Sequence, residues 1–251
     1  MTGEKQALTV AAVIPVLDEE TAIGDVVAGV RAHVGQVIVV DGNSKDATAE
    51  RARAAGAKVI VEAQRGYGRA MSAGIAAIDP AVDIVLFIDG DGSDRTDLIP
   101  TLLAPIQQGR ADFVHGSRIK GEREAGSLSL TQLTAGHLAG GLVRLVYGVR
   151  YTDMSPYRAI RRSALDRLGM RDATFGWNLE MQMRAAAAQL RIVEVPVGQR
   201  QRRGGVSKVS GDLGTAVRVT WVLGATFLRL AATLRRERSD QSLARSTGKA
   251  G

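Results

Sequence analysis

Several features that define common protein classes are missing from this sequence. It has no cysteine, which excludes disulfide scaffolds, zinc sites built on cysteine and thiol nucleophiles. Its three histidines leave little for a metal site built on imidazole. Neither the dinucleotide-binding pattern GxGxxG nor the P-loop pattern GxxxxGKS/T occurs. The absence of both patterns argues against NAD(P) enzymes and P-loop ATPases.

Long uncharged apolar runs are missing as well. The longest apolar stretch, residues 216–234, contains Arg218 and Arg229, and a charge inside the hydrocarbon core of a membrane is costly. This stretch predicts an amphipathic C-terminal helix that either packs on the domain or lies on a membrane surface. The polar N-terminus shows no secretory signal. We therefore expect a cytoplasmic protein, with peripheral attachment to the inner face of the cell membrane left open.

Positive charge, by contrast, is in excess and unevenly distributed. The 251 residues include 33 Lys and Arg against 26 Asp and Glu, a net charge of +7. Residues 1–100 are net acidic, whereas residues 198–251 hold 11 basic and only 3 acidic side chains. This division indicates an anionic partner for the C-terminal part and a different task for the acidic part. Only 4% of residues are aromatic, so stacking on nucleic-acid bases lacks support and no nucleic-acid partner is expected.

Short β-rich runs alternate with helical patterns along the first 115 residues or so. This alternation predicts an α/β protein with a mostly parallel sheet and helices on both faces. The predicted strands are 8–16, 36–40, 59–61, 84–88, 112–115, 157–160 and 191–197. The predicted helices are 21–33, 44–55 with Ser44 as N-cap, 68–78, 96–108, 128–147 and 177–189. Residues 199–211 form a predicted loop, and 238–251 a disordered tail.

Most of the candidate polar side chains lie in the segments that directly follow the strands, and in open α/β sheets ligands bind at that edge. Asp89 and Asp91 flank Gly90 after a run of five apolar residues. Two such carboxylates suit Mg²⁺ or Mn²⁺, which also take phosphate oxygens as ligands. A polar turn without a metal is the alternative, because Asp-Gly is a common turn dipeptide.

Two further strand ends carry candidate ligand groups. Asp41 begins the run Asp-Gly-Asn-Ser and is a candidate acceptor for hydrogen bonds from a base or ribose, or else part of a helix cap. Arg65, with Gly66 and Gly68, precedes a predicted helix. Glycines, a helix N-terminus and a cation together favour an anion site, and a flexible loop is the alternative.

The basic loop and the later helix hold the remaining candidates. The loop contains Arg200, Arg202, Arg203, Ser207 and Lys208, which either close over phosphates or form a solvated loop. Glu180 stands in an apolar helix start beside Trp177 and is either a general base or a solvent-facing residue. Asp153 and the Tyr157-Arg158 pair lie just upstream and are assigned to the same acceptor side.

Taken in order, these motifs resemble those of inverting family-2 glycosyltransferases with the GT-A fold. The resemblance is closest to the dolichyl-phosphate mannose/glucose synthase-like branch and spans about residues 9–212. It rests on 14–19 (IPVLDE), 40–48 (VDGNSKDAT), 65–68 (RGYG), 87–92 (FIDGDG), 116–118 (GSR), 153–158, 177–180 and 205–208. Two features depart from the family. Asp41-Gly42 stands where Asp-Asp is frequent, and C-terminal transmembrane helices are missing.

The resemblance implies a role for each candidate. Base, ribose and donor would be held by Pro15, Leu17, Glu19, Asp41, Arg65, Gly68, Asp89 and Gly90. Asp89 and Asp91 match the D-x-D motif that binds Mg²⁺ or Mn²⁺ and the diphosphate. Phosphates of donor or acceptor would meet Arg118, Arg158, Arg202, Arg203, Ser207 and Lys208. Glu180, Asp91 and Asp153 would be catalytic, with Glu180 as the base if the acceptor is a hydroxyl; a phosphate acceptor needs none.

The expected protein is therefore a metal-dependent inverting glycosyltransferase that uses a UDP- or GDP-sugar. Its acceptor would be a polyprenyl phosphate or a cell-envelope glycan or lipid precursor. One GT-A domain would cover residues 1–237, with a nucleotide-sugar half (1–118) and an acceptor half (119–237), and a homodimer is left open. Alternatives are a sugar-1-phosphate nucleotidyltransferase, which usually has a Gly-rich loop where Leu17 to Glu20 stand here, and a non-catalytic basic protein that binds membranes or nucleic acid.

Overall fold

The structure is a computed structural model that describes residues 7–203 and 223–237. Its strands are β1 (Val10–Val16), β2 (Gln36–Asp41), β3 (Lys58–Val61), β4 (Ile84–Phe87), β5 (Phe113–Ser117), β6 (Arg158–Arg161) and β7 (Ile192–Pro196). Its helices are α1 (Ile23–Arg31), α2 (Thr48–Ala54), α3 (Tyr67–Ala76), α4 (Ile99–Gln107), α5 (Leu130–Tyr147), α6 (Arg162–Leu168) and α7 (Trp177–Ala187). A 3₁₀ turn, η1 (Thr96–Leu98), precedes α4, and residues 223–237 are helical.

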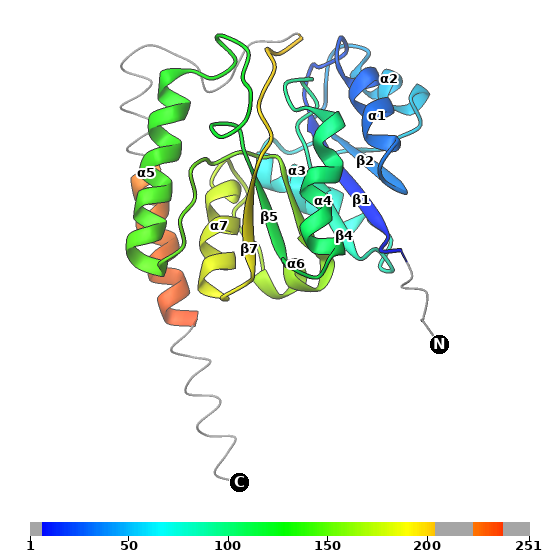
Figure 1. Ribbon diagram of the computed structural model, residues 1–251. Helices are drawn as coiled ribbons and strands as arrows, with labels where there is room; N and C mark the ends of the chain where they lie inside the picture. The colour runs from blue at the N-terminus through cyan, green and yellow to red at the C-terminus, as the bar shows by residue number, and fades with distance from the viewer. Residues whose placement is uncertain (1–6, 204–222, 238–251) are drawn as a thin grey trace.

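All seven strands belong to one sheet in the order β3-β2-β1-β4-β6-β5-β7. β6 pairs antiparallel with both β4 and β5, and the other pairs are parallel. Six strands therefore run in one direction, and their carboxyl ends meet along one edge, at the top of Figure 1. The prediction of a mostly parallel sheet is confirmed.

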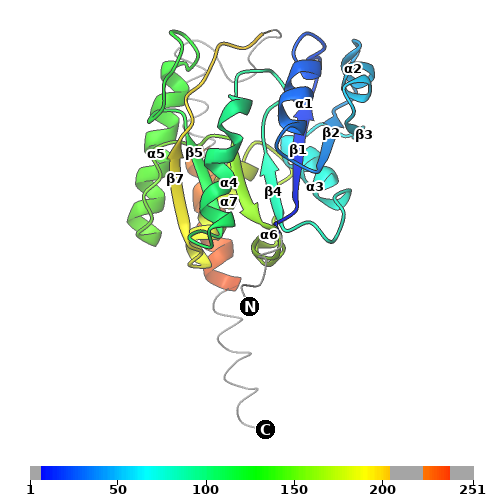
Figure 2. The same ribbon diagram turned by 45° about the vertical axis from the view of Figure 1, so that its right-hand side comes forward.

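Alternate residues along each strand enter two separate cores, one on each face of the sheet. Val13, Val40 and Phe87 contribute to the first core, which α3, α5, α6 and α7 cover. Ile14 and Leu86 contribute to the second, which α1 and α4 cover. This is the period of two that a pleated strand imposes. Figures 1 and 2 show these helices on opposite faces, with the strand ends left open between them.

One local prediction needs correction, and two features of the fold were not predicted. Ser44 is not an N-cap: α2 begins at Thr48 after Ala47, and the Ser44 hydroxyl instead bonds Asp41 Oδ1. Helix α6 was not expected from the sequence, because its seven residues are too few to show a clear helical period. The strand at β6 was expected, but period-two patterning carries no information about direction, and its antiparallel pairing is visible only in the sheet.

The helix over residues 223–237 packs on the domain. Phe227, Leu230 and Leu234 recur at helical spacing and are buried in the first core, and Arg229 pairs with Asp172 at 2.5 Å. Figure 1 shows this helix beside α5. Of the two alternatives for the C-terminal helix, the described part adopts the packed one. Residues 216–222, the predicted tail 238–251, Ser207 and Lys208 lie outside the described residues.

No helix in the described ranges is long and apolar enough to cross a bilayer.

Candidate active site

Three carboxylates gather just beyond the end of β4. Asp91 and Asp94 are buried and Asp89 is half-buried. Asp94 accepts the backbone N–H of Asp89 at 3.1 Å, and its second oxygen, Oδ1, is buried without a hydrogen-bond partner in the part of the chain that is described. Burial and the charges of Asp91 and Asp94 raise the pKa of Asp89 well above its usual value. Burial and Asp91 likewise raise the pKa of Asp94 to about 7.

These carboxylates fit a divalent cation that takes most of its ligands from a substrate. Like charges held together in a buried site are costly unless a proton or a cation compensates them. No set of three or more His, Asp or Glu side chains within residues 7–203 and 223–237 forms a ready-made metal cage. Mg²⁺ and Mn²⁺ do not require one, because one or two carboxylates, waters and phosphate oxygens suffice for Mg²⁺-type coordination. The donor set at Asp89 and Asp91 meets that description.

The end of β1 lies directly against this cluster. A Cβ placed on Gly90 would come within 2.3 Å of Val16 Cγ1, so only glycine allows the two strand ends to approach this closely. Glu19, which follows β1, is buried, and its backbone N–H donates to the Thr48 hydroxyl at 2.8 Å. The predicted donor residues Pro15 and Leu17 are half-buried at the same edge. The sheet thus brings the predicted nucleotide side and the predicted metal side together.

Asp41 occupies the neighbouring strand end and is already engaged. Its Oδ1 accepts hydrogen bonds from the backbone N–H and the hydroxyl of Ser44. The Ser44 hydroxyl in turn accepts the N–H of Asp18 at 2.9 Å. Asp18 has a positive φ of 56° and accepts the N–H of Lys45 at 2.8 Å. This reciprocal set fixes the loops after β1 and β2, and its contact with a base or ribose stays a prediction.

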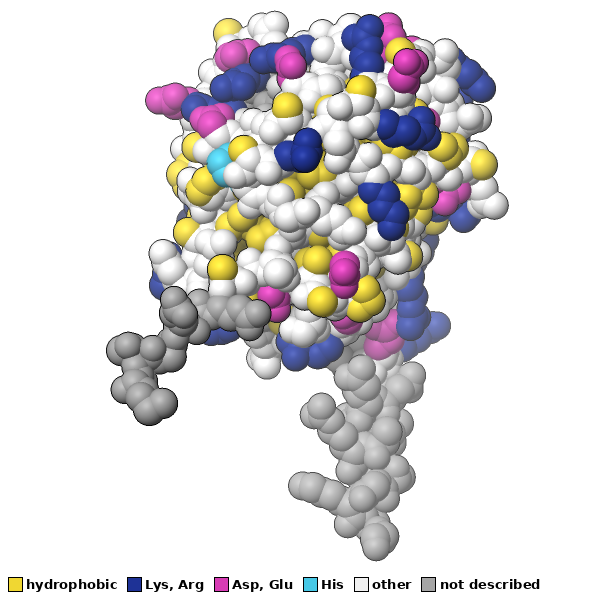
Figure 3. All heavy atoms as spheres, turned by 90° about the vertical axis from the view of Figure 1, so that its right-hand side faces the viewer, with side chains coloured by type: hydrophobic (Ala, Val, Ile, Leu, Met, Phe, Trp, Pro, Cys, Tyr) yellow, Lys and Arg dark blue, Asp and Glu magenta, His cyan; other side chains and the backbone are white. Residues whose placement is uncertain are grey.

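The segment that follows β7 lies across the carboxylates. Arg202 donates to Glu19 Oε1 at 2.5 Å, and its Nε lies 3.3 Å from Asp91 Oδ2. The backbone N–H of Arg203 donates to Asp91 O at 3.2 Å, and the Arg203 side chain pairs with Asp25. In the side view of Figure 3, basic and acidic side chains crowd along the top of the molecule, the level of the strand ends. The described part of the basic loop is therefore docked, and the alternative of a freely solvated loop is wrong for Arg202.

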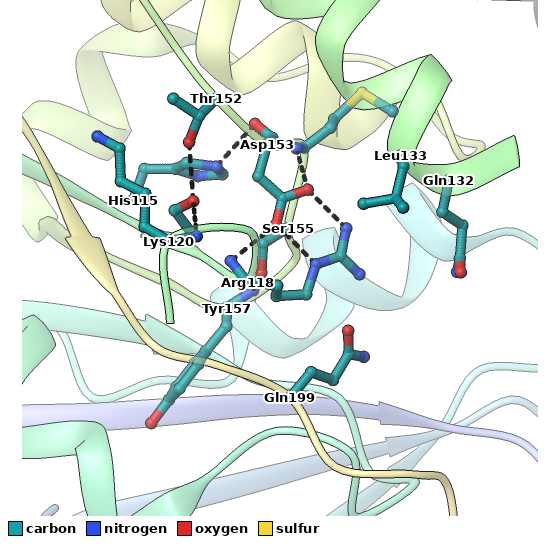
Figure 4. A network of polar contacts seen from close by, with 12 residues as sticks. His115, Arg118, Lys120, Gln132, Leu133, Thr152, Asp153, Ser155, Tyr157 and Gln199 are labelled. Carbon is teal, nitrogen blue, oxygen red and sulfur yellow. Dashed lines mark hydrogen bonds and ion pairs between the residues drawn. The ribbon is translucent and has the colours of Figure 1, made fainter. Parts of the chain in front are cut away.

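Arg118 and Asp153 form a buried ion pair at the end of β5 (Figure 4). Nε and Nη2 of Arg118 donate to the two Asp153 oxygens at 2.7 and 2.8 Å, and the Arg118 backbone N–H adds a third bond at 3.0 Å. Burial alone would raise the pKa of Asp153, but the hydrogen bonds and charge of Arg118 outweigh it and lower the pKa to about 2. The role of Asp153 that the structure shows is to hold Arg118 beside the carboxylates, which lie close enough to interact with it electrostatically.

Arg158 needs correction as a phosphate contact. It is fully buried and donates to the carbonyl oxygens of Asn178 and Ser155. Burial lowers its pKa to about 10, so it stays charged at neutral pH. Arg158 therefore binds backbone carbonyls beneath the site and does not present its guanidinium to a ligand.

Tyr67 is a second buried polar side chain near the carboxylates. Burial and the charge of Asp89 raise its pKa well above the usual value, so the Tyr67 hydroxyl remains protonated.

The predicted anion site before α3 also needs correction. The N–H groups of Gly68 and Arg69 donate to the carbonyls of Thr174 and Ala173, both at 3.2 Å. A Cβ on Gly68 would lie 1.9 Å from Asp172 O, so glycine serves close backbone packing at this point. Arg65 is exposed. The N–H groups of Gly68 and Arg69 thus join two protein segments and are not open to a phosphate.

Glu180 is neither solvent-facing nor free. Its side chain is 1% exposed, and Oε2 accepts the backbone N–H groups of Arg171 and Asp172 at 3.0 and 2.7 Å. Oε1 pairs with Arg184 Nε at 2.8 Å, and Arg184 also binds Glu237 of the C-terminal helix. Oε2 therefore holds the 171–172 turn, which places the backbone that α3 packs on, and Oε1 is engaged by Arg184. The structure supports a positioning role for Glu180 and gives no support to a free general base.

We expect Glu180→Gln to act on stability more than on chemistry. The amide keeps one acceptor oxygen for the turn but loses the charged bond to Arg184, so the free energy of unfolding should fall by about 1–3 kcal/mol. The rate of sugar transfer should fall less than tenfold, whereas loss of a general base costs about 10²–10⁴-fold. Urea unfolding and initial rates measure the two effects. Glu237→Gln, which removes the outer partner of Arg184, is the matched control. A rate loss above a hundredfold in Glu180→Gln, without such a loss in Glu237→Gln, would support Glu180 as the general base after all.

The comparisons with known proteins decide the family. Residues 11–169 match Glycosyl transferase family 2. The chain belongs to this family. It is 39% identical over 218 residues to an uncharacterized glycosyltransferase of Mycobacterium bovis, covering 85% of this chain and 93% of that protein. It is 34% identical over 216 residues to the undecaprenyl-phosphate mannosyltransferase of Micrococcus luteus, covering 79% of this chain and 86% of that one.

A solved structure confirms the GT-A fold for this glycosyltransferase. Glucosyl-3-phosphoglycerate synthase from Mycobacterium tuberculosis, in complex with Mn²⁺, UDP-glucose and phosphoglyceric acid, matches with a TM-score of 0.70 and 25% identity. The match covers 90% of this chain and 80% of that one. The resemblance seen in the sequence motifs and the mostly parallel sheet are thus both confirmed.

Several site residues escape sequence reasoning. Asp94 has a local signal in the sequence, because it is the third acidic residue, after Asp89 and Asp91, in the six residues 89–94. Gln199, whose amide donates to the Ser93 hydroxyl at 3.2 Å, comes from a loop that only the fold brings to Ser93. The pair of Lys120 and Glu194 likewise joins a loop to β7 and has no local signal.

Proposed function

We propose that this glycosyltransferase moves a sugar from a nucleoside diphosphate sugar to an acceptor with inversion, using Mg²⁺ or Mn²⁺. The observation that carries the proposal is the cluster of Asp89, Asp91 and Asp94, which faces Arg118 and Arg202 and in which the carboxyl pKa values of Asp89 and Asp94 are raised. Carboxylates for a cation and arginines for phosphates stand at one edge of the sheet. The mycobacterial synthase, which was solved with Mn²⁺ and UDP-glucose, supports the same assignment.

The chain's own residues account for the charge that develops during transfer. Asp89 and Asp91 would hold the cation, which when bound supplies a positive charge against the diphosphate. Arg118 is kept rigid by Asp153 and adds a fixed positive charge at the end of β5. Arg202 and Arg203 would exchange their carboxylate partners for donor phosphates, since guanidinium binds either group in the same bidentate way. Interactions that strengthen as the leaving diphosphate gains charge lower the barrier.

We propose a lipid phosphate, of the polyprenyl class, as the acceptor. An ionised phosphate needs no base to remove a proton, and the candidate base Glu180 is engaged by three donors, as Asp153 is by Arg118. The relative from Micrococcus luteus bears the name undecaprenyl-phosphate mannosyltransferase, which supports this choice. A hydroxyl acceptor is the second candidate, favoured by the phosphoglyceric acid in the mycobacterial complex. We further assign residues 1–118 to the donor and 119–237 to the acceptor, except Arg202 and Arg203, which lie against Glu19, Asp91 and Asp25 on the donor side.

A thermal-shift screen tests the donor. We expect a UDP- or GDP-sugar with Mn²⁺ to raise the melting temperature by about 5–10 °C at roughly 100 times its dissociation constant, because ligand binding to the folded state adds about 2.7 kcal/mol. The same sugar nucleotide with a chelator should give a markedly smaller shift. A shift with nucleoside triphosphates and none with any sugar nucleotide would instead favour a nucleotidyltransferase, and no shift with either class would contradict the proposal.

A further inference from the structure

A basic pocket lies between α5, the helix at the edge of the molecule in Figures 1 and 2, and the segment that follows this helix. Its volume is about 190 Å³. The residues that line it are His137, Gly140, Gly141, Arg144, Arg150, Tyr151 and Thr152. Four of them come from α5 at spacings of three, four and seven residues, which places them on one face of the helix. The other three belong to the segment that follows the helix.

The backbone explains why a pocket forms there. Gly148 has a φ of 74° and ends α5 in the left-handed region, which turns the chain back along the helix. A Cβ on Gly140 would lie 2.2 Å from Tyr151 O, so the returning segment touches the helix at that point. A Cβ on Gly141 would meet nothing within 4 Å. The pocket is therefore closed on the Gly140 side and open above Gly141.

The positive charge in this pocket has no partner within the described residues. Neither Arg144 nor Arg150, both exposed, has an ion pair with a carboxylate in residues 7–203 or 223–237. Two acidic side chains lie next to the lining residue Thr152. Asp153, the next residue, is already paired with Arg118, and Glu194, which binds Thr152, is paired with Lys120. Two such guanidinium groups beside one opening favour an anion, and phosphate matches their geometry.

Apolar side chains border the pocket on the same helix. Leu138, Leu145 and Val146 are 42%, 82% and 51% exposed, and they are three of the six large hydrophobic residues exposed in the described chain. Leu138 and Leu145 are seven residues apart and follow His137 and Arg144 directly, so the apolar strip runs alongside the basic one. A free phosphate in water would leave these side chains exposed, whereas the boundary of a bilayer covers both strips at once.

We propose that this pocket holds the phosphate headgroup of an anionic phospholipid, so that the α5 surface rests on a membrane. Arg144 and Arg150 bind the phosphate, and Leu138 and Leu145 enter the boundary between headgroups and acyl chains. The contact is made by α5, whereas the C-terminal helix packs its apolar face on the domain. The proposal does not depend on which sugar or acceptor the enzyme uses, because the pocket lies outside the carboxylate cluster.

Vesicle sedimentation with the full-length chain tests the proposal. We expect binding to phosphatidylcholine vesicles that contain phosphatidylglycerol and little binding to pure phosphatidylcholine. Arg144→Ala and Arg150→Ala should each weaken binding about fivefold, the usual effect of one arginine at an anionic surface. Arg53→Ala, an equal loss of charge on an exposed position of α2, controls for net charge, since residues 198–251 add a positive background of their own.

A second pair of variants isolates the pocket from the general charge. Gly141→Glu places a carboxylate in the opening and should abolish the contribution of both arginines, whereas Gly141→Ala should bind like the unchanged protein. Leu145→Ser should weaken binding to vesicles and leave the binding of soluble glycerol phosphate unchanged. Two outcomes would overturn the proposal of a membrane surface. One is an equal loss of vesicle binding in Arg144→Ala and Arg53→Ala, and the other is that soluble glycerol phosphate competes for the pocket as effectively as vesicles do.

Discussion

Asp91→Asn is expected to lower the rate of sugar transfer by about 10²–10³-fold, the effect of removing one charge-stabilising group from a reacting centre. The amide keeps an oxygen to accept the N–H and hydroxyl of Ser93, which Asp91 Oδ1 binds at 2.9 and 2.7 Å, so the fold should persist. It loses the negative charge that a divalent cation requires. Initial rates at several Mn²⁺ concentrations measure the effect, and extra Mn²⁺ should recover part of the activity.

Asp97→Asn is the matched control for this experiment. Asp97 lies in η1, which follows the loop of Asp91, but is half exposed and pairs only with Arg95 and Arg200 in the described chain. Its replacement should change the rate less than twofold, because exposed ion pairs contribute at most about 1 kcal/mol. If Asp91→Asn transfers sugar as fast as the Asp97→Asn control, the carboxylate cluster is not the metal site, although the family assignment would stand.

The fold was largely predictable because local patterning determines it. Runs such as Val10 to Val16 are apolar throughout, as expected for a strand covered on both faces, and the helices between them show the 3.6 period. The candidate site followed from one further rule, that ligands bind at the carboxyl ends of parallel strands. Asp89 and Asp91 became candidates in this way, since their position after β4 is a local property of the sequence.

Contacts between distant segments were not predictable in the same way. Arg202 lies over Glu19 and Asp91 only because the chain after β7 returns across the sheet edge. No local signal shows that return. Glu180 illustrates the opposite case: Arg184 is four residues further along the helix, a spacing at which opposite charges pair. That partner is visible in the sequence, and the spacing alone argues for a positioning role of Glu180.

The ion pair of Arg118 and Asp153 leads to the largest expected effect on stability. Asp153→Ala leaves a guanidinium buried without its carboxylate, and breaking a buried pair in this way costs about 3–5 kcal/mol. The Met154 N–H, which Asp153 Oδ1 accepts at 2.7 Å, also loses its partner. We therefore expect the free energy of unfolding, measured in urea at neutral pH, to fall by that amount, and the melting temperature to fall by about 6–20 °C.

The pH dependence of the free energy of unfolding separates the contribution of the Asp153 charge from the contribution of its packing. The pKa of Asp153 is lowered to about 2 in the folded protein, against about 3.9 in an unfolded chain. A lowered folded pKa contributes stability above the unfolded value, and that contribution disappears as the pH falls from about 4 to 2. The protein should lose this part of its stability over that range, and Asp153→Asn should not.

The double variant Asp153→Leu with Arg118→Met removes both charges and should be more stable than Asp153→Ala. A double variant at least as unstable as Asp153→Ala would show that cavity formation, and not an unpaired buried charge, dominates the loss.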